Sequence, residues 1–349
     1  MKSYKVVEFG KPLEKVEATP PEPKGTEVLI RIATCGVCHS DIHLHDGYFD
    51  LGGGRKLDMG RSMKLPHTLG HEIVGEVVAA GPDAGDVKPG SKWLVFPWIG
   101  CGECALCKNG DEHLCGPNQA LGVSRDGGFS DHVVVPHPRY LVDYGDVPDA
   151  VACTYACSGL TAFSALKKAE HVSDADPILI VGAGGVGQSA IGLCQSLHGV
   201  APIVADIDPA KREQALALGA GEAVDPSDKS ARKELLQKTG GGFAAVIDFV
   251  GAASSTEFGM SVLRKGGKIV IVGLFGGSID LPLATVPMKA ITISGSYVGS
   301  LAELEELAAI GRKGGIPQIS VSTRSLDEVQ ETLDQLREGK IVGRAVLQA

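Results

Sequence analysis

The sequence predicts an α/β protein in which a mostly antiparallel β region precedes a doubly wound parallel sheet. Short apolar runs broken by proline and glycine fill the first part of the chain, at 27–34, 72–81, 92–98 and 129–136. They lack long helical periods, as expected for a partly closed β domain. From about residue 159, buried-type strands alternate with helical stretches, at 178–184, 202–208, 244–250, 268–274 and 291–297, with a weaker strand at 222–226. Six strands separated by helices predict the doubly wound sheet.

The last part of the chain returns to mixed structure. Residues 301–315 and 326–340 have the pattern of amphipathic helices, and 344–349 read as a final strand. A length of 349 residues favours about two domains.

Composition excludes several classes of function. The net charge of -9 argues against nucleic acid or an anionic membrane as partner, because both select basic surfaces. No apolar run approaches the length that spans a bilayer, and the opening MKSYKVVEFGK lacks the apolar core of a signal peptide. We therefore expect a cytoplasmic protein. Its 9 cysteines are then expected to be metal ligands or buried thiols, since the cytosol keeps thiols reduced.

A dinucleotide-binding turn follows the strand at 178–184. Gly182, Gly184 and Gly187 stand between an apolar strand and a helix, with Gly185 and Val186 inside the motif. The first glycine makes the turn, the second lets the backbone approach a pyrophosphate, and the third lets helix pack on strand. Asp206 ends the next strand and suits the two hydroxyls of an adenosine ribose, which favours NAD over NADP. The alternative is a glycine-rich turn followed by an acidic strand end.

Four cysteines lie within fifteen residues. Their spacing is C-x2-C-x2-C-x7-C, and four thiolates can close a tetrahedron around zinc without an open position for chemistry. We interpret the loop as a structural zinc site. Iron–sulfur ligation is the main rival, and a nucleic-acid zinc module is a weaker one. The residues are Cys101, Cys104, Cys107 and Cys115.

A second group of ligand-type residues is ambiguous from residue type alone. The stretch CGVCHSDIHLH at 35–45 could be a redox dithiol, half of a closed metal site or one arm of a catalytic metal site. Two further pairs, His67 with His71 and Cys153 with Cys157, could supply partners. A free cysteine is more often a small buried hydrophobe than a ligand, so the residue types leave the choice open.

The motifs CGVCHSD, LGHEIVGEV, the four-cysteine loop, ACSGLTAF and VGAGGVG occur in order over essentially the whole chain. Together they resemble the zinc-dependent alcohol dehydrogenases of the medium-chain dehydrogenase family, particularly the tetrameric bacterial and archaeal type. The resemblance implies a GroES-like catalytic domain at 1–158, a Rossmann NAD-binding domain at 159–296 and a C-terminal return to the catalytic domain at 297–349. It implies two zinc ions per chain, NAD as cofactor and a homotetramer.

The resemblance also assigns the ambiguous group. It implies that a catalytic zinc is held by Cys38, His71 and Cys157, with Glu72 as an alternative ligand. Such a zinc keeps one open position and acts as a Lewis acid, so a bound alcohol loses its proton and its alkoxide releases hydride to NAD. The activity would be reversible oxidation of a primary or secondary alcohol, in the alcohol:NAD oxidoreductase class.

Other residues of the stretch receive roles in the same way. Asp41 would orient His71, and Ser40 and His43 would relay the alcohol proton to solvent, since histidine titrates near neutrality. We expect Cys35 to be a buried thiol and His45 a surface residue. Trp98 would be a wall of the substrate pocket, or an ordinary buried tryptophan. Further cofactor contacts implied by the resemblance are His39, Thr161, Lys211, Val250, Val272, Ser296, Val298 and Arg344.

One departure is the long interval between Cys38 and His71, 33 positions apart. The inserted stretch, 46–66, is locally basic at Arg55, Lys56, Arg61 and Lys64. We expect it to cover the pocket or a subunit contact; a solvated surface loop is the alternative. In this fold the strand at 291–297 commonly pairs with its copy in another subunit.

Two other function classes stay open. One is a different zinc oxidoreductase of the family that acts on a polyol, threonine or a thiol adduct of formaldehyde. The other is a non-catalytic zinc protein that binds NAD only as a sensor, which the presence of both relay residues disfavours.

Overall fold

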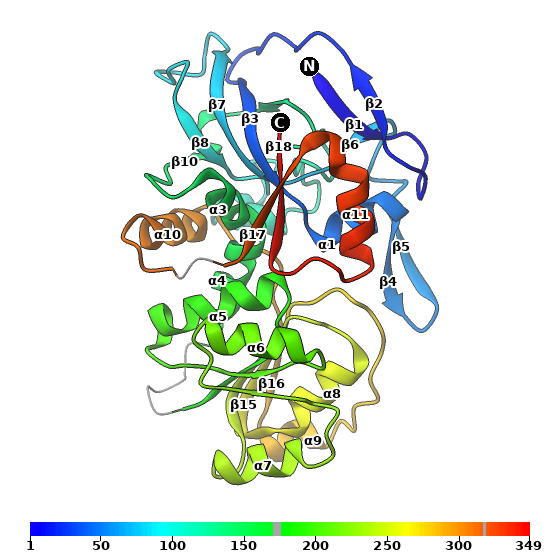
Figure 1. Cartoon of the computed structure of the whole chain (residues 1–349), viewed down its shortest axis with the longest axis vertical. Helices are drawn as coiled ribbons and strands as arrows, with labels where there is room; N and C mark the ends of the chain where they lie inside the picture. Colours follow the sequence, from blue (N-terminus) through cyan, green and yellow to red (C-terminus); the bar gives the residue numbers. More distant parts are fainter. Residues whose placement is uncertain (170–175, 317–318) are drawn as a thin grey trace.

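The computed structural model describes residues 1–169, 176–316 and 319–349. Figure 1 shows two halves along the long axis. The upper half contains the blue N-terminal third together with the red C-terminal strand, and the lower half contains the green and yellow middle of the chain. The chain therefore leaves the upper half once and returns to it.

The upper half is built on a seven-stranded sheet in which the order is β10-β8-β7-β3-β18-β17, with β9 also paired to β3. Antiparallel pairing of β3 with β7 places Gly36 opposite Glu72 and Cys35 opposite Ile73. The two segments that flank the ambiguous residues of the sequence thus lie side by side. The strands are β3 (Val28–Gly36), β7 (Glu72–Ala80), β8 (Lys92–Val95), β9 (His132–Val135), β10 (Leu141–Val142), β17 (Val321–Ser325) and β18 (Arg344–Gln348).

Two smaller sheets complete this half. One has the order β2-β1-β6 and the other is the hairpin of β4 and β5. The hairpin belongs to the inserted stretch 46–66, which is therefore not a featureless surface loop. Met59 and Met63 of this stretch are buried. The strands are β1 (Lys2–Val6), β2 (Glu14–Glu17), β4 (Tyr48–Gly52), β5 (Arg55–Asp58) and β6 (His67–Thr68).

The lower half confirms the predicted parallel sheet. Its six strands have the order β13-β12-β11-β14-β15-β16, and every pair is parallel. The order reverses at β11, where the chain continues to β12 on one side and β14 lies on the other, so the carboxyl end of β11 faces a crevice. The strands are β11 (Ile178–Val181), β12 (Ile203–Ala205), β13 (Glu222–Val224), β14 (Phe243–Asp248), β15 (Leu263–Ile271) and β16 (Thr292–Gly295).

A continuous helical segment joins the two halves. It consists of α3 (Asp149–Thr154), a π-helical turn η3 (Tyr155–Gly159) and α4 (Leu160–Lys167). π-Helical turns occur frequently at functional sites because they displace a side chain from the regular helical position. Cys157 lies in this turn and is buried.

The other helices cover the sheets. In the upper half are α1 (His39–Asp46), α2 (Ala105–Lys108), η1 (Glu112–Leu114), η2 (Pro138–Tyr140), α10 (Leu301–Arg312), η4 (Leu326–Glu328) and α11 (Val329–Arg337). In the lower half are α5 (Gly185–His198), α6 (Pro209–Ala217), α7 (Ala231–Lys238), α8 (Ala253–Ser261) and α9 (Thr285–Lys289). Within the described ranges, none of these helices has the length and apolarity needed to cross a bilayer.

The C-terminal return is visible in the sheet pairing. β18 pairs antiparallel with β3, with Val346 opposite Gly36. The helices expected at 301–315 and 326–340 correspond to α10 and to η4 with α11. The domain limits at 158 and 296 stay predictions, but the return of residues beyond 320 to the first sheet agrees with them.

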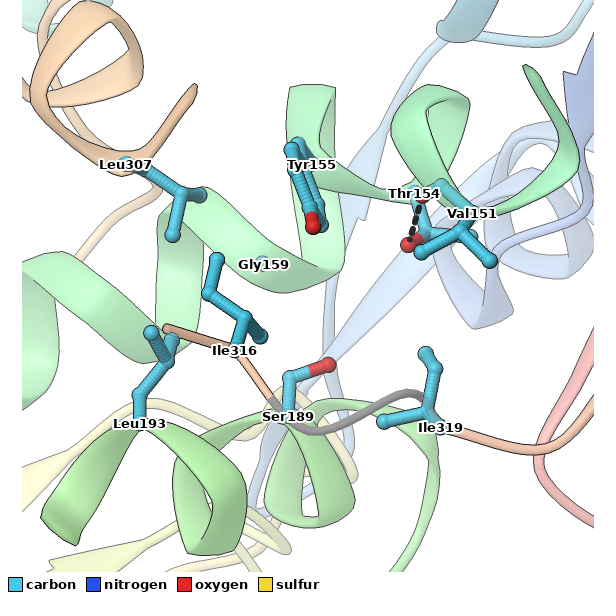
Figure 2. Close-up of a pocket in the computed structure, with 9 residues that line it drawn as sticks. All are labelled: Val151, Thr154, Tyr155, Gly159, Ser189, Leu193, Leu307, Ile316 and Ile319. Atoms are coloured by element: carbon cyan, nitrogen blue, oxygen red, sulfur yellow. Dashed lines mark hydrogen bonds between the residues drawn. The ribbon is translucent and has the colours of Figure 1, made fainter. Parts of the chain in front are cut away.

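Figure 2 shows an apolar cavity between α5 and the helical segment of α3, η3 and α4 that joins the two halves. Val151, Tyr155 and Gly159 line it from one side and Ser189 and Leu193 from the other. Its volume is about 10 Å³, which is at the lower limit for a single water molecule. The cavity is therefore a packing defect between the two halves and has no room for a substrate.

Candidate active site and metal centres

Cys38, His71 and Cys157 come together from three separate elements. Cys38 immediately precedes α1, His71 lies between β6 and β7, and Cys157 is in η3. One ligand atom from each residue lies within 4.8 Å of the other two, and all three residues are buried. Each ambiguous pair of the sequence therefore has one member in this group and one outside it, the outside members being Cys35, His67 and Cys153.

The geometry of the trio fits zinc. Two sulfurs bound at 2.3 Å to a tetrahedral zinc lie about 3.8 Å apart, and the Cys38 and Cys157 Sγ atoms are 3.9 Å apart. Both ring nitrogens of His71 are buried without a hydrogen-bond partner among the described residues, although buried polar atoms are normally paired; Nδ1 lies 3.3 Å from Asp41 Oδ1. The hydrogen bond between the two thiols lowers the pKa of Cys38 well below its usual value and raises the pKa of Cys157 well above it, which favours a thiolate at Cys38. Three donors leave one position free for substrate.

Asp41 fixes both Cys38 and His71. Its carboxylate is fully buried, and Oδ2 accepts a 2.8 Å hydrogen bond from the Cys38 N–H. Oδ1 lies 3.3 Å from His71 Nδ1 and accepts from the Gly70 N–H at 3.2 Å. A carboxylate on the far ring nitrogen sets the histidine tautomer and leaves Nε2 for a metal. Although burial opposes it, this carboxylate raises the pKa of His71 well above its ordinary value.

Glu72 is directed toward Arg344 and is not part of the trio. Both side chains are buried, and they form an ion pair between Glu72 Oε2 and Arg344 Nη2. Glu72 Oε1 accepts from the Ser158 N–H at 3.1 Å, next to Cys157. Burial raises the pKa of Glu72. In this arrangement Glu72 binds Arg344 and the backbone beside Cys157. Its role as an alternative ligand stays a prediction.

The glycine turn has the properties that a pyrophosphate requires. Gly182 has φ +93° and its Cα faces Val250, so that a Cβ there would lie 2.6 Å from Val250 Cγ2. A Cβ on Gly187 would overlap the carbonyl oxygen of Gly182, whereas nothing lies within 4 Å of a Cβ on Gly184. The space at Gly184 is open at the N-terminus of α5, where free N–H groups attract phosphate. A Cβ on Gly185 would lie 2.6 Å from Arg344 Cδ, so the buried ion pair reaches this turn.

Asp206 lies beside the same turn. Its carboxylate is partly exposed, with Oδ2 accepting from the Ala183 N–H at 2.8 Å and Oδ1 from the Asp208 N–H at 2.9 Å. These contacts hold an acidic group next to the open space. A carboxylate there accepts hydrogen bonds from ribose hydroxyls and repels a 2′-phosphate.

The four-cysteine loop forms a second compact group. The four sulfurs of Cys101, Cys104, Cys107 and Cys115 lie within 4.8 Å of one another. The Cys101–Cys107 and Cys104–Cys115 distances are both 3.9 Å, which again matches a tetrahedral thiolate site. Backbone N–H groups, first that of Glu103, lower the pKa of Cys101 to about 6. Four sulfurs would fill all four coordination positions of a tetrahedral metal ion, so the group fits a closed structural site.

Two family models match the chain. The alcohol dehydrogenase GroES-like domain matches residues 24–147, and the zinc-binding dehydrogenase domain matches residues 185–311. An NAD-dependent alcohol dehydrogenase from Sulfurisphaera tokodaii is 34% identical over 99% of both chains. An alcohol dehydrogenase from Geobacillus stearothermophilus is 33% identical over 99% of both chains.

The chain belongs to the zinc-binding alcohol dehydrogenases. The alcohol dehydrogenase from Aeropyrum pernix superimposes on it with a TM-score of 0.89 at 30% identity and full coverage of both chains. The D-arabinose dehydrogenase from Sulfolobus solfataricus gives a TM-score of 0.85 at 27% identity, over 100% of this chain and 99% of that one. The predicted combination of GroES-like and Rossmann folds is confirmed.

In this dehydrogenase, α1 carries the two residues assigned to the proton relay. Ser40 and His43 are three positions apart on α1, which places them on one helix face, and both are partly exposed. The His43 ring packs against Phe49 of β4 at 4.9 Å between centroids and against His39 at 5.8 Å. Burial lowers the pKa of His43. Phe49 was not recognised from the sequence, because no residue pattern links β4 to α1.

Trp98 closes the metal site on another side. It is buried, its ring centroid is 5.3 Å from that of His71, and its Nε1–H donates to the Ala156 carbonyl at 2.9 Å. Tyr297 meets it edge to face at 6.0 Å. Tyr297 lies two positions after the end of β16 and was also missed from the sequence. The two rings form an aromatic pair beside His71, in which Trp98 is buried and Tyr297 is exposed.

The remaining predicted cofactor residues differ in their exposure to solvent. Thr161 and Val298 are buried, while Lys211, Val250, Val272 and Ser296 are partly exposed and His39 is exposed. Ser296 Oγ accepts from Lys168 Nζ at 2.8 Å.

The surface assignment of His45 is wrong. The side chain is buried, with Nε2 2.7 Å from the Lys11 carbonyl and Nδ1 3.3 Å from Asp46 Oδ1. Arg337 of α11 covers it, with Nη2 3.5 Å from Nδ1, while binding Asp46 through both guanidinium nitrogens. The C-terminal part of the chain removes this side chain from solvent. The sequence around His45 gives no sign of that contact. Cys35 is buried as expected.

Proposed function

We propose that this alcohol dehydrogenase reversibly oxidises primary or secondary alcohols to aldehydes or ketones with NAD, using one zinc ion for catalysis and a second for structure. The observation that carries the proposal is the buried trio of Cys38, His71 and Cys157, within 4.8 Å of one another. Arg344 connects it to the dinucleotide turn, because it pairs with Glu72 and lies against Gly185. Metal donors and cofactor turn thus share one crevice.

Cys38, His71 and Cys157 would hold the catalytic zinc. When bound there, zinc supplies Lewis-acid chemistry, polarising the substrate oxygen and lowering the pKa of the alcohol hydroxyl. Asp41 keeps His71 in the tautomer that presents Nε2 to the metal. The buried Trp98 ring and the Tyr297 ring that meets it edge to face would confine the substrate carbon chain on one side.

Ser40 and His43 would remove the alcohol proton. The Ser40 hydroxyl would accept the proton of the alcohol as it gives up its own, and the His43 imidazole would hold the released proton before it reaches solvent. Both side chains are partly exposed, which gives this route access to water. An imidazole with a pKa below its ordinary value is neutral at pH 7 and available as the acceptor.

NAD would lie across the carboxyl edge of the six-stranded sheet. Gly184, Gly185, Val186 and Gly187 receive the pyrophosphate and Asp206 receives the adenosine ribose. Arg344 and His39 add positive charge or hydrogen bonds beside the pyrophosphate, and Lys211 contacts the ribose. The nicotinamide end would contact Thr161, Val250, Val272, Ser296 and Val298.

Cys101, Cys104, Cys107 and Cys115 would hold the second zinc. Their loop is anchored by buried Glu112, whose carboxylate accepts from the Gly100 N–H at 3.1 Å and from the Tyr140 hydroxyl at 2.7 Å. The contacts tie the loop to the upper sheet. A closed thiolate site of this kind contributes folding energy and no reaction chemistry.

We further propose a cytoplasmic homotetramer that has small-molecule partners and no nucleic-acid or membrane partner. Strand β16 is the edge of its sheet. Ile293 on this strand is exposed, as are Phe275, Leu283 and Met288 nearby in sequence. An exposed apolar edge strand favours pairing with another copy. Light scattering of the purified protein gives the mass that checks this.

A sugar or polyol substrate is the second candidate. One structural neighbour is a D-arabinose dehydrogenase, and a relative that is 32% identical over 84% of this chain and 81% of its own is an L-galactonate-5-dehydrogenase from Escherichia coli. The aromatic pair of Trp98 and Tyr297 favours less polar alcohols. A panel of alcohols, polyols, threonine and carbonyl compounds assayed with NAD(H) tests the proposal. Turnover of simple alcohols is expected; no turnover by zinc-loaded protein would refute it.

A further inference from the structure

The hairpin of β4 and β5 contacts the lower half through bare backbone. A Cβ added at Gly52 would overlap the carbonyl oxygen of Gly277. A Cβ added at Gly276 would lie 2.8 Å from the carbonyl oxygen of Asp50. Real Cβ atoms do not approach other atoms so closely, so only glycine at 52 and 276 permits this contact (Figure 1 shows the hairpin at the boundary of the two halves).

On the hairpin side, the contact leads to the relay histidine. Gly52 has φ +79°, and its N–H donates to Asp50 Oδ1 at 2.7 Å, which holds the tip in this conformation. Three positions before Gly52, Phe49 packs its ring against His43. A displacement of the hairpin therefore moves the surface on which His43 rests.

On the opposite side, the contact leads to the cofactor crevice. The Gly276 N–H donates to the Gly251 carbonyl at 3.1 Å, and the Phe275 N–H to the Val250 carbonyl at 3.2 Å. The side chain of Val250 in turn lies against Gly182 of the dinucleotide turn. Fully buried Asp248 holds this loop by accepting from the Val250 and Gly251 N–H groups, each at 3.0 Å. The 273–277 segment is thus fixed to one wall of the crevice.

We propose that Gly52 and Gly276 are positioning residues for NAD: the contacts of Gly52 with Gly277 and of Gly276 with Asp50 set the distance between the upper and lower walls of the cofactor crevice. This inference rests on the proposed function in taking NAD as the cofactor. A ligand that touches both walls binds more tightly when the walls are held at the correct separation beforehand. Relieving the overlap at position 52 or 276 requires the two backbones to separate, and shifts of about 1 Å in such positions have large effects on function.

The test introduces a single methyl group from either side. Gly52→Ala has a matched control in Gly54→Ala, since Gly54 has φ +76° but nothing within 4 Å of its Cβ. Gly276→Ala has a control in Gly219→Ala, where φ is +103° and the space is also open. The controls share the backbone strain of alanine at positive φ and lack the overlap.

NADH affinity is measured by fluorescence titration without substrate, alongside KM for NAD, kcat and Tm. Gly52→Ala and Gly276→Ala are each expected to raise the Kd for NADH by about five- to tenfold. KM for NAD should rise more than kcat falls. The double variant should lose little more affinity than either single variant, because one contact is already broken. Each control should stay within about twofold of the wild type.

The proposal is overturned if Gly52→Ala and Gly54→Ala have the same Kd. If Gly52→Ala is poorly folded, Asp50→Ala replaces it as the test, because Asp50→Ala removes the acceptor of the Gly52 N–H without adding atoms. A Kd for NADH that is unchanged in Asp50→Ala would also reject the proposal. A wild-type protein that binds NADH but turns over no alcohol refutes only the proposed function. One that binds no NADH refutes both.

Discussion

Arg344 and Glu72 form a buried ion pair that joins the group of Cys38, His71 and Cys157 to the glycine turn before α5. Glu72 immediately follows His71, and its second oxygen accepts from the backbone next to Cys157. Arg344 begins β18 and touches Gly185. One interaction thus connects β7, η3, β18 and the start of α5. The C-terminal strand thus contributes Arg344 beside a group of candidate metal donors that all come before residue 158.

Loss of the Glu72 charge should destabilise the protein strongly. Glu72→Gln leaves a buried guanidinium without its counter-ion, and such changes typically cost about 3–5 kcal/mol. The free energy of unfolding from urea denaturation measures the effect. Glu76→Gln on the same strand is the control, because its pair with Arg31 is solvent-exposed and should contribute less than about 1 kcal/mol. Similar costs for the two variants would contradict the buried-pair account.

Asp206 should determine the choice of cofactor. Asp206→Gly removes the group that would bind the ribose hydroxyls and repel a 2′-phosphate. We expect kcat/KM for NAD to fall by about tenfold or more and kcat/KM for NADP to rise. Parallel assays with the two cofactors measure this, and an unchanged preference for NAD would show that another residue makes the choice.

Ser40→Ala should impair proton transfer while sparing cofactor binding. General acid–base groups typically contribute 10²- to 10⁴-fold to rate, so we expect kcat near neutral pH to fall by about 10²-fold or more. NADH titration should give an unchanged Kd. Ser62→Ala is the control, since among the described residues its hydroxyl bonds to Met59 of the same inserted stretch. Full activity of Ser40→Ala would exclude the relay.

Cys107→Ser should remove one zinc ion and lower the Tm. Four thiolates that lie close together would hold the zinc ion with no open coordination position, and the loop would depend on that ion for its fold. We therefore expect the Tm to fall by about 5 °C or more. Metal analysis and calorimetry measure both effects. Cys194→Ser is the control, because Cys194 is a buried thiol of α5 outside either sulfur group. A brown, iron-containing protein would instead support an iron–sulfur site.

The sequence predicts those parts of the fold whose pattern is local. Gly182, Gly184 and Gly187 follow an apolar strand, so their turn and the six-stranded sheet are visible in the residue order. The four cysteines are equally local. The catalytic trio is different, because Cys38 and Cys157 are far apart in the chain and each has a second cysteine nearby. Only resemblance to the family favoured one member of each pair, and the fold brings ligand atoms of Cys38, His71 and Cys157 within 4.8 Å of one another.

Features created by packing between distant segments were not predictable. His45 was assigned to the surface because nothing near it in sequence reveals that α11 covers it. The inserted stretch was expected to cover the pocket or a subunit contact. The contact of Gly52 with Gly277 could not be predicted, because the two residues are more than two hundred positions apart. Phe49 and Tyr297 likewise acquire their places beside His43 and Trp98 only in the folded chain.

The central claim is that Cys38, and not its neighbour Cys35, holds the catalytic zinc with His71 and Cys157. Zinc content measured by elemental analysis on purified wild type, Cys38→Ala and Cys35→Ala tests it most directly, with alcohol oxidation assayed on the same samples. We predict two zinc ions per chain and activity for the wild type and Cys35→Ala, and one zinc ion without activity for Cys38→Ala. Equal zinc loss in the two variants would contradict the account and restore the reading of 35–38 as a paired-cysteine site.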